Sequence, residues 1–391
     1  MAGRERRELV EYARGRLARQ LAQRGEPAEA VATARGALAP DVLTLGFARR
    51  MTEYKRATLL LRDQDRLVRL LANPTRPVQI IVAGKAHPGD DTGRDHVRQW
   101  AEFVQRPDVR GRAVFLEDYD IALAQELVQG VDVWINTPRR PLEASGTSGM
   151  KLLVNGGLNL STLDGWWVEA YSARVGWALG NATDERPTSD EEDAEQVYGL
   201  LESAVVPEFY ARDADGIPRR WIARMRASLG ELTPRFSSNR MLREYVDGPY
   251  RRARTAFAER CAAGTGVTRE LRRWHDDLAA AWPGVRVSDL VSRRDGDAWV
   301  FTVQVHLGDA RADAIAVEIY ADAVGAQPAT VTPTRRGAEL PAPRRGFEYH
   351  ARIRTERPHT DFTPRVVAHH SVALVPSEAP FIRWWSDPAQ R

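Results

Sequence analysis

Residues 78–85 read VQIIVAGK and decide the fold class of this 391-residue chain. The apolar run is continuous rather than alternating, which is typical of a strand that is buried on both faces. Glycine and lysine follow directly, where such a strand ends. The stretch therefore predicts a buried strand of a parallel sheet with a polar group at its carboxyl end.

Further apolar runs lie on both sides of this segment, and helix-like stretches separate them. We expect strands at 42–47, 113–116, 131–135 and 158–161, and helices at 56–72, 93–106, 121–128 and 147–155. Strands that alternate with helices indicate a doubly wound α/β domain with a parallel sheet. Ligands of such domains bind beyond the carboxyl ends of the strands.

The pattern changes near residue 283. The run at 298–305 and the alternation of Ile315, Val317 and Ile319 predict a small all-β sandwich module. We therefore expect an N-terminal helical segment at 1–42, an α/β domain with C-terminal helices at 43–283, and the β module at 284–391.

Composition excludes several classes of protein. Lys and Arg total 56 against 53 Asp and Glu, and they are interspersed, so we expect no nucleic-acid partner. No run of eighteen apolar residues is present, so we expect no membrane partner. A single cysteine, Cys261, fits a reducing compartment, and we expect a cytoplasmic protein. The histidines lack the spacing of a metal site, so no metal is expected.

Lysine is rare in this chain. Only Lys55, Lys85 and Lys151 are present, whereas arginine is used almost everywhere else. An amine can lose its proton and form an imine, which a guanidinium cannot do. The three lysines are therefore candidates for chemistry that arginine does not support.

The strongest candidate site is residues 141–151, PLEASGTSGMK. Its small residues and glycines leave backbone N–H groups open at a helix start, an arrangement that binds phosphate. Lys151, one turn into that helix, has the position that a Schiff-base cofactor requires. These residues by themselves leave open an ordinary Gly-rich loop with a surface lysine.

Three weaker segments follow other predicted strands. Arg50 and Lys55 flank a strand end and a helix start, so both can reach one pocket, although a solvated basic helix start is the alternative. Gly84 before Lys85 permits close approach of a ligand. Tyr119, after the strand at 113–116, is a stacking candidate or a half-buried core aromatic.

Together, and in this order, these segments resemble the α-glucan (glycogen/maltodextrin) phosphorylase family, in its C-terminal catalytic half. The similarity runs from Thr44 to Gly176. It includes the stretches FARR at 47–50, EYKR at 53–56, GKA at 84–86, FLE at 115–117, EASGT at 143–147, MK at 150–151 and LDG at 163–165.

The resemblance implies a Rossmann-like domain of a GT-B-type glycosyltransferase at 43–283 and a role for each matching residue. It makes Arg50 and Lys55 catalytic, phosphate-binding residues. The residues that it assigns to the cofactor, pyridoxal 5'-phosphate, are Lys151, Arg49, Gly146, Thr147, Lys85 and Tyr119. The residues that it assigns to the glucose unit are Glu143, Ala144, Ser145 and Tyr54.

The activity implied is that of a retaining hexosyltransferase in glycogen catabolism. It is the phosphorolysis of terminal α-1,4-glucosyl residues of a glucan by inorganic phosphate to α-D-glucose 1-phosphate. In this family the cofactor phosphate serves as the proton relay.

Members of the family also have a large N-terminal domain, and this chain begins about forty residues before its first expected strand. We therefore expect a fragment, a mis-called start or one half of a split enzyme, with little activity alone. The expected protein partner is an N-terminal phosphorylase half or a second copy. Two alternatives stay open. One is a nucleotide-sugar glycosyltransferase of the glycogen synthase type, and the other a non-catalytic glucan-binding remnant.

Overall fold

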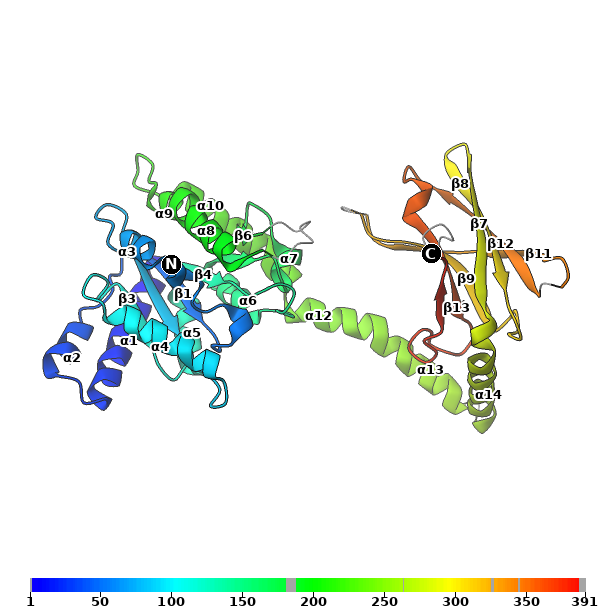
Figure 1. Ribbon diagram of the computed structural model, residues 1–391, viewed down its shortest axis with the longest axis horizontal. Helices are drawn as coiled ribbons and strands as arrows, with labels where there is room; N and C mark the ends of the chain where they lie inside the picture. Colours follow the sequence, from blue (N-terminus) through cyan, green and yellow to red (C-terminus); the bar gives the residue numbers. More distant parts are fainter. Residues whose placement is uncertain (1, 181–187, 263, 325–326, 344, 387–391) are drawn as a thin grey trace. The chain divides into compact units, whose positions relative to one another are not determined.

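The computed structural model describes residues 2–180, 188–262, 264–324, 327–343 and 345–386 (Figure 1). The chain divides into two compact units, Met1–Met241 and Leu242–Arg391. The helices after residue 241 therefore belong to the same unit as the β module, whereas the sequence pattern assigned residues up to 283 to the α/β domain. No helix of the described residues is long and apolar enough to cross a membrane.

Unit 1 is built on a six-stranded sheet with the order β3-β2-β1-β4-β5-β6, and all its strand pairs are parallel. The strands are β1 (Leu43–Ala48), β2 (Val78–Ala83), β3 (Ala113–Leu116), β4 (Val133–Asn136), β5 (Leu158–Thr162) and β6 (Gly176–Leu179). The predicted α/β fold with a parallel sheet is confirmed. The short strand β6 was not predicted, because four residues that begin with glycine carry little strand signal.

Helices precede, connect and follow these strands and cover both faces of the sheet. They are α1 (Ala2–Gln23), α2 (Ala28–Ala34), α3 (Gln64–Leu71), α4 (Asp91–Gln105), α5 (Ile121–Gly130), α6 (Thr147–Val154), α7 (Trp166–Ala170), α8 (Asp190–Leu200), α9 (Val206–Tyr210), α10 (Arg219–Ala227) and α11 (Thr233–Arg235). Figure 1 shows α1 and α5 on one side of the sheet and α8 on the other.

The long helix expected at 56–72 is instead two short turns of 3₁₀-helix and a short α-helix. The 3₁₀ turns are η1 (Glu53–Lys55) and η2 (Leu59–Asp63), and α3 follows them. Arg56 has a left-handed backbone with φ 47°, which ends the first turn. Asp63 then caps α3, because its carboxylate accepts the N–H of Arg66 at 2.9 Å.

Each buried strand contributes to two cores, because alternate side chains point to opposite faces. Leu45 and Ile80 pack with α3, α4 and α8, whereas Ile81 and Trp134 pack with α1 and α5. All four side chains are buried, and each contributes roughly 1.5–3 kcal/mol of hydrophobic stabilisation.

The direction of the strand order reverses between β1 and β4. In open α/β sheets the crevice that binds ligands lies at this point, beyond the carboxyl ends of the strands. Residue 49 follows β1 and residue 136 ends β4, so both lie at the mouth of that crevice.

Unit 2 consists of helices followed by two antiparallel four-stranded sheets with orders β10-β9-β13-β14 and β11-β12-β8-β7. Its helices are α12 (Ser238–Tyr245, which begins in unit 1), α13 (Arg251–Ala262) and α14 (Thr265–Ala281). Its strands are β7 (Arg286–Asp295), β8 (Ala298–His306), β9 (Ile315–Ala321), β10 (Thr330–Pro333), β11 (Arg335–Glu339), β12 (Gly346–Arg354), β13 (Phe362–Ala368) and β14 (Ile382–Trp384). Phe301 from one sheet and Ile319 and Val366 from the other share one core.

A buried ion pair attaches α1 to the amino-end edge of the parallel sheet. Arg6 donates to the carboxylate of Asp132 at 2.6 Å, and the N–H of Thr44 donates to the same carboxylate at 2.9 Å. Burial raises the pKa of Asp132 to about 6, although Arg6 and the Thr44 N–H both act to lower it. Tyr210 is a further titratable group close to this carboxylate.

We predict that Asp132→Asn changes the pH dependence of stability. The folded-state pKa of Asp132 lies above its unfolded value, so its contribution is fully present below about pH 4 and is lost as the pH rises through 6. The free energy of unfolding of the native chain minus that of the variant should fall by roughly 2 kcal/mol between pH 4 and 7. Urea unfolding followed by circular dichroism measures it. A difference that stays constant over this range would contradict the assignment.

Candidate functional site

The carboxyl ends of β1 and β4 hold an arginine and an asparagine that face each other. Arg49 Nη1 donates to Oδ1 of Asn136, and Asn136 Nδ2 donates to Ser161 Oγ at 3.0 Å, which orients the amide. Arg49 is 8% exposed although it follows a strand directly. The guanidinium is therefore held inside the crevice rather than in solvent.

A single carboxylate joins two cations in this crevice. Glu143 Oε2 accepts a hydrogen bond from Lys55 Nζ at 2.9 Å and another from Arg49 Nη2. Lys55, at the end of η1, is 6% exposed, and its Nζ lies 4.6 Å from the ring centroid of Tyr54. The cluster carries two positive charges and one negative charge, so it has an excess positive charge in a largely dry environment.

The loop that carries Glu143 is fixed by the segment after β5. The N–H of Glu143 donates to Asp164 Oδ2 at 2.8 Å, and the N–H of Trp166 donates to the carbonyl of Ser145 at 2.9 Å. Gly165, between them, has φ 54°, and a Cβ there would lie 2.5 Å from the Ser145 oxygen. Only glycine allows this close approach, so the Asp164–Gly165 pair sets the position of Glu143.

The shared charges shift the pKa of each partner. Burial lowers the pKa of the Arg49 guanidinium, although Glu143 opposes that effect. Burial alone would raise the pKa of Glu143, but the hydrogen bond from Lys55 and the charge of Arg49 hold it below its ordinary value. Glu143 is therefore an ionised acceptor at neutral pH.

One donor of this cluster is unused. Arg49 Nε is buried and has no hydrogen-bond partner among the residues that the structure describes. Buried guanidinium N–H groups in proteins are normally satisfied, and an unsatisfied one costs roughly 1–3 kcal/mol. Together with the excess positive charge, this donor fits a phosphate group, whose oxygens accept hydrogen bonds from a guanidinium.

The predicted phosphate cradle lies at the start of α6. Gly146 caps the helix with φ 87°, a conformation that favours glycine. A Cβ on Gly149 would lie 2.6 Å from Asn159 Oδ1, so α6 packs closely on β5 through this glycine. Thr147 and Lys151 are both exposed on α6. An exposed amine on a helix that begins in a glycine-rich turn suits an aldehyde cofactor with a phosphate.

The other predicted residues differ in how they relate to the cluster. Tyr119 is half-buried, and burial raises its pKa while the charge of Arg49 opposes that rise, which indicates that the two side chains are close. Lys85 is exposed, but its carbonyl accepts the N–H of Met51 at 3.1 Å, so it lies beside the end of β1. Ala144 and Ser145 are exposed on the Glu143 loop.

Arg50 does not join the buried cluster. Its side chain is exposed, whereas its neighbour Arg49 points into the crevice. The sequence pattern paired Arg50 with Lys55. The structure pairs Arg49 with Lys55 through Glu143, because consecutive residues at a strand end point in opposite directions.

Sequence reasoning assigned no role to three residues that shape the site. Asn136 and Asp164 orient Arg49 and Glu143, and Arg56 supports the loop after β4. Arg56 Nε donates to the carbonyl of Thr137 at 2.8 Å, and its guanidinium forms a buried ion pair with Asp193. A polar residue that ends an apolar strand, as Asn136 does, was the signal that would have identified the first of them.

Part of this chain is similar in sequence to known phosphorylases. Residues 23–182 match the sequence model of the carbohydrate phosphorylases. The chain is 45% identical over 287 residues to the glycogen phosphorylase of Mycobacterium tuberculosis (strain H37Rv), covering 73% of this chain and 33% of that protein. It is 42% identical over 282 residues to the maltodextrin phosphorylase of Thermococcus litoralis, and that match covers 72% of this chain and 33% of that protein. It is 49% identical over 210 residues to the glycogen phosphorylase of Aquifex aeolicus. That match covers 54% of this chain and 30% of that protein. The chain thus spans about a third of the length of the curated relatives it matches.

We predict that Glu143→Gln destabilises unit 1 and exposes an anion site. Arg49 and Lys55 would stay buried without a counter-charge, which costs roughly 3–5 kcal/mol. Inorganic phosphate should offset part of this loss, so it should raise the thermal midpoint of the variant more than that of the native chain. Thermal unfolding in phosphate and in chloride of equal ionic strength measures the effect.

The matched control is Glu169→Gln, which removes an exposed carboxylate from α7. Its thermal midpoint should respond to phosphate as the native chain does. An equal response of both variants would mean that Arg49 and Lys55 do not form an anion site.

Proposed function

We propose that this chain, whose residues 23–182 match the carbohydrate phosphorylases, belongs to that family and supplies the cofactor- and phosphate-binding part of an α-glucan phosphorylase. The proposed reaction is reversible, retaining phosphorolysis of terminal α-1,4-glucosyl residues to α-D-glucose 1-phosphate. The proposed architecture is the C-terminal half of a GT-B-type enzyme. The proposed location is the cytoplasm.

The observation that carries this proposal is the buried cation pair with its unused donor. Arg49 and Lys55 meet on one carboxylate beside the Gly146 turn, and Arg49 Nε has no partner among the described residues. A site with spare positive charge and a spare donor favours a phosphate-transfer substrate over a neutral one.

The residues of this chain fit pyridoxal 5'-phosphate. Lys151 is the proposed imine-forming amine, and the backbone of Gly146 and Thr147 is the proposed phosphate cradle. Arg49, Lys85 and Tyr119 are the proposed neighbours of the cofactor. When bound, this cofactor supplies a phosphate group that donates and accepts a proton.

The cations of the crevice have a definite electrostatic task in this proposal. Two unit negative charges about 5 Å apart repel each other by roughly 3 kcal/mol at an effective dielectric constant of about 20. Arg49 and Lys55 offset such repulsion between a cofactor phosphate and a substrate phosphate, and so stabilise the charge that moves between them. Arg50, exposed at the same strand end, is the proposed further ligand of the substrate phosphate.

The loop at 143–145 is the proposed holder of the glucose unit, together with Tyr54. Glu143 has a lowered pKa and remains ionised, so it accepts hydrogen bonds from sugar hydroxyls. The carboxylate of Asp164 accepts the N–H of Glu143 and the N–H of Trp166 donates to Ser145, and these two hydrogen bonds hold the geometry of the loop before substrate binds.

We predict that the cofactor forms its imine at Lys151. The experiment is incubation of the chain with pyridoxal 5'-phosphate, reduction with borohydride and mapping of the labelled peptide. The chain has only three lysines, so few side-chain amines can form the reduced imine. It should appear at Lys151, should persist in Lys85→Arg, and should be lost in Lys151→Arg.

A label at Lys55 or Lys85 in the native chain would contradict this assignment. A chain that takes up no pyridoxal 5'-phosphate would instead favour a nucleotide-sugar glycosyltransferase, which has no use for an imine-forming lysine.

We predict that Lys55→Ala lowers phosphorolysis at least about 100-fold while cofactor binding persists, because the variant loses a cation that stabilises charge at the reacting phosphates. The measurement is glucose 1-phosphate release from maltodextrin and phosphate. Because the chain spans a third of its relatives, the assay includes the unmatched part of the M. tuberculosis relative as a separate polypeptide.

Arg76→Ala, at an exposed position before the amino end of β2, is the matched control and should leave the rate unchanged. Undiminished phosphorolysis by Lys55→Ala would refute the role of this lysine. If the native chain shows no activity over a range of partner concentrations, the proposal that it completes a phosphorylase fails.

A further inference from the structure

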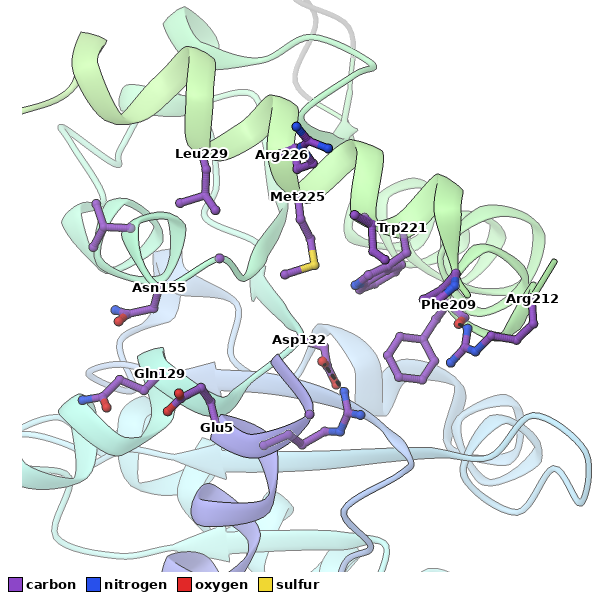
Figure 2. Close-up of a pocket in the computed structure, with 16 residues that line it drawn as sticks. Glu5, Gln129, Asp132, Asn155, Phe209, Arg212, Trp221, Met225, Arg226 and Leu229 are labelled. Atoms are coloured by element: carbon purple, nitrogen blue, oxygen red, sulfur yellow. Dashed lines mark hydrogen bonds and ion pairs between the residues drawn. The ribbon is translucent and has the colours of Figure 1, made fainter. Parts of the chain in front are cut away.

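A cavity lies at the amino ends of the parallel strands, whereas Arg49, Lys55 and Glu143 lie at their carboxyl ends. It has a volume of about 680 Å³ and lies where β4 and β5 begin, beside Asp132 and Gly156 (Figure 2). Helix α6 begins just after the Glu143 loop, whereas its last residue Val154 and its C-cap residue Asn155 line the cavity. The cavity is therefore separate from the candidate active site.

Apolar and aromatic side chains form one wall of this cavity. Trp221 and Met225 project from α10, and Phe209 from α9 lies beside them, as Figure 2 shows. Ile222 and Leu229 complete this wall. The volume is within the range of pockets that hold small organic molecules, which are typically lined by such side chains with a few polar groups.

Positive charge gathers beside the ring of Phe209. The guanidinium carbon of Arg6 lies 5.2 Å from the ring centroid and that of Arg212 lies 5.6 Å from it. Arg6 is paired with Asp132 at 2.6 Å, whereas the hydrogen bonds of Arg212 that involve described residues go to backbone carbonyls of Phe209 and Ala211. Of these two guanidinium groups, Arg6 is paired with the buried carboxylate of Asp132, and Arg212 bonds only to backbone carbonyls among the described residues.

The residues that line the cavity carry more positive than negative charges. Three arginines line the cavity, and the acidic residues that line it are Glu5 and Asp132. An apolar cavity with excess positive charge at one end is complementary to a molecule that has a ring and a negative group.

We propose that this cavity binds a small organic anion that carries an aromatic ring. The ring lies against Trp221, Met225 and Phe209, and the anionic group lies at Arg212 and Arg6. The binding site is independent of the phosphorolysis reaction, because none of its residues belongs to the crevice at the carboxyl ends of the strands.

The probe for the test is 8-anilinonaphthalene-1-sulfonate, an aromatic anion whose fluorescence rises in apolar sites. Its neutral counterpart, N-phenyl-1-naphthylamine, has the same ring system without the sulfonate. Fluorescence titration of the full chain with both probes separates recognition of the anion from burial of the ring.

Arg212→Glu is the first variant. It should weaken binding of the sulfonate at least about tenfold, because it replaces an attractive charge by a repulsive one. Binding of the neutral probe should change less than about threefold, since the apolar wall is intact. Arg220→Glu, an exposed position on α10 outside the lining, is the matched control and should leave both affinities unchanged.

Ile222→Trp is the second variant, which guards against an effect on folding. Ile222 is 38% exposed at the cavity, so a larger side chain fills space without disturbing the core. This variant should weaken both probes, with the thermal midpoint of the chain unchanged. Sulfonate affinity that is the same in the native chain, Arg212→Glu and Ile222→Trp would overturn the proposal, as would an equal loss in Arg212→Glu and Arg220→Glu.

Discussion

The contact on which the site depends is the carboxylate of Glu143 between Lys55 and Arg49. It allows two cations to stay buried at the end of a strand, where neither would be stable without an opposite charge. The arrangement also leaves a net positive charge and one unused donor, Arg49 Nε. The carboxylate of Glu143 therefore stabilises the buried Arg49 and Lys55 without neutralising both of them, and the remaining positive charge can bind an anion.

The sheet topology decides why these groups meet. β1 lies between β2 and β4, so the chain segments that leave β1 and β4 diverge and open a crevice between them. Asp164 and Gly165, after β5, then hold the Glu143 loop over that crevice. Side chains from three separate strand ends thus converge without any long, unsupported loop.

Much of this was predictable from local pattern, and the exceptions have physical causes. The strands β1 to β5 were expected because each is a short apolar run, whereas β6 was too short and too glycine-rich to be recognised. The prediction that a helix begins at residue 56 was wrong. Arg56 has a left-handed backbone, and its side chain bonds to the Thr137 carbonyl and pairs with Asp193. Arg49 and Arg50 are identical in type, and local pattern does not tell which of them turns inward.

By itself the sequence determined most of the strand and helix segments and the alternation that makes a parallel sheet, and it predicted the candidate site segments around Arg49, Lys55 and Lys151. These are properties of neighbouring residues, and hydrophobic period and glycine placement report them directly. Only the tertiary structure decided that Glu143 joins Lys55 and Arg49, from 88 and 94 positions away along the chain. It alone also formed the cavity between α1 and α10. Contacts at such separations depend on strand order and register, which a local pattern does not encode.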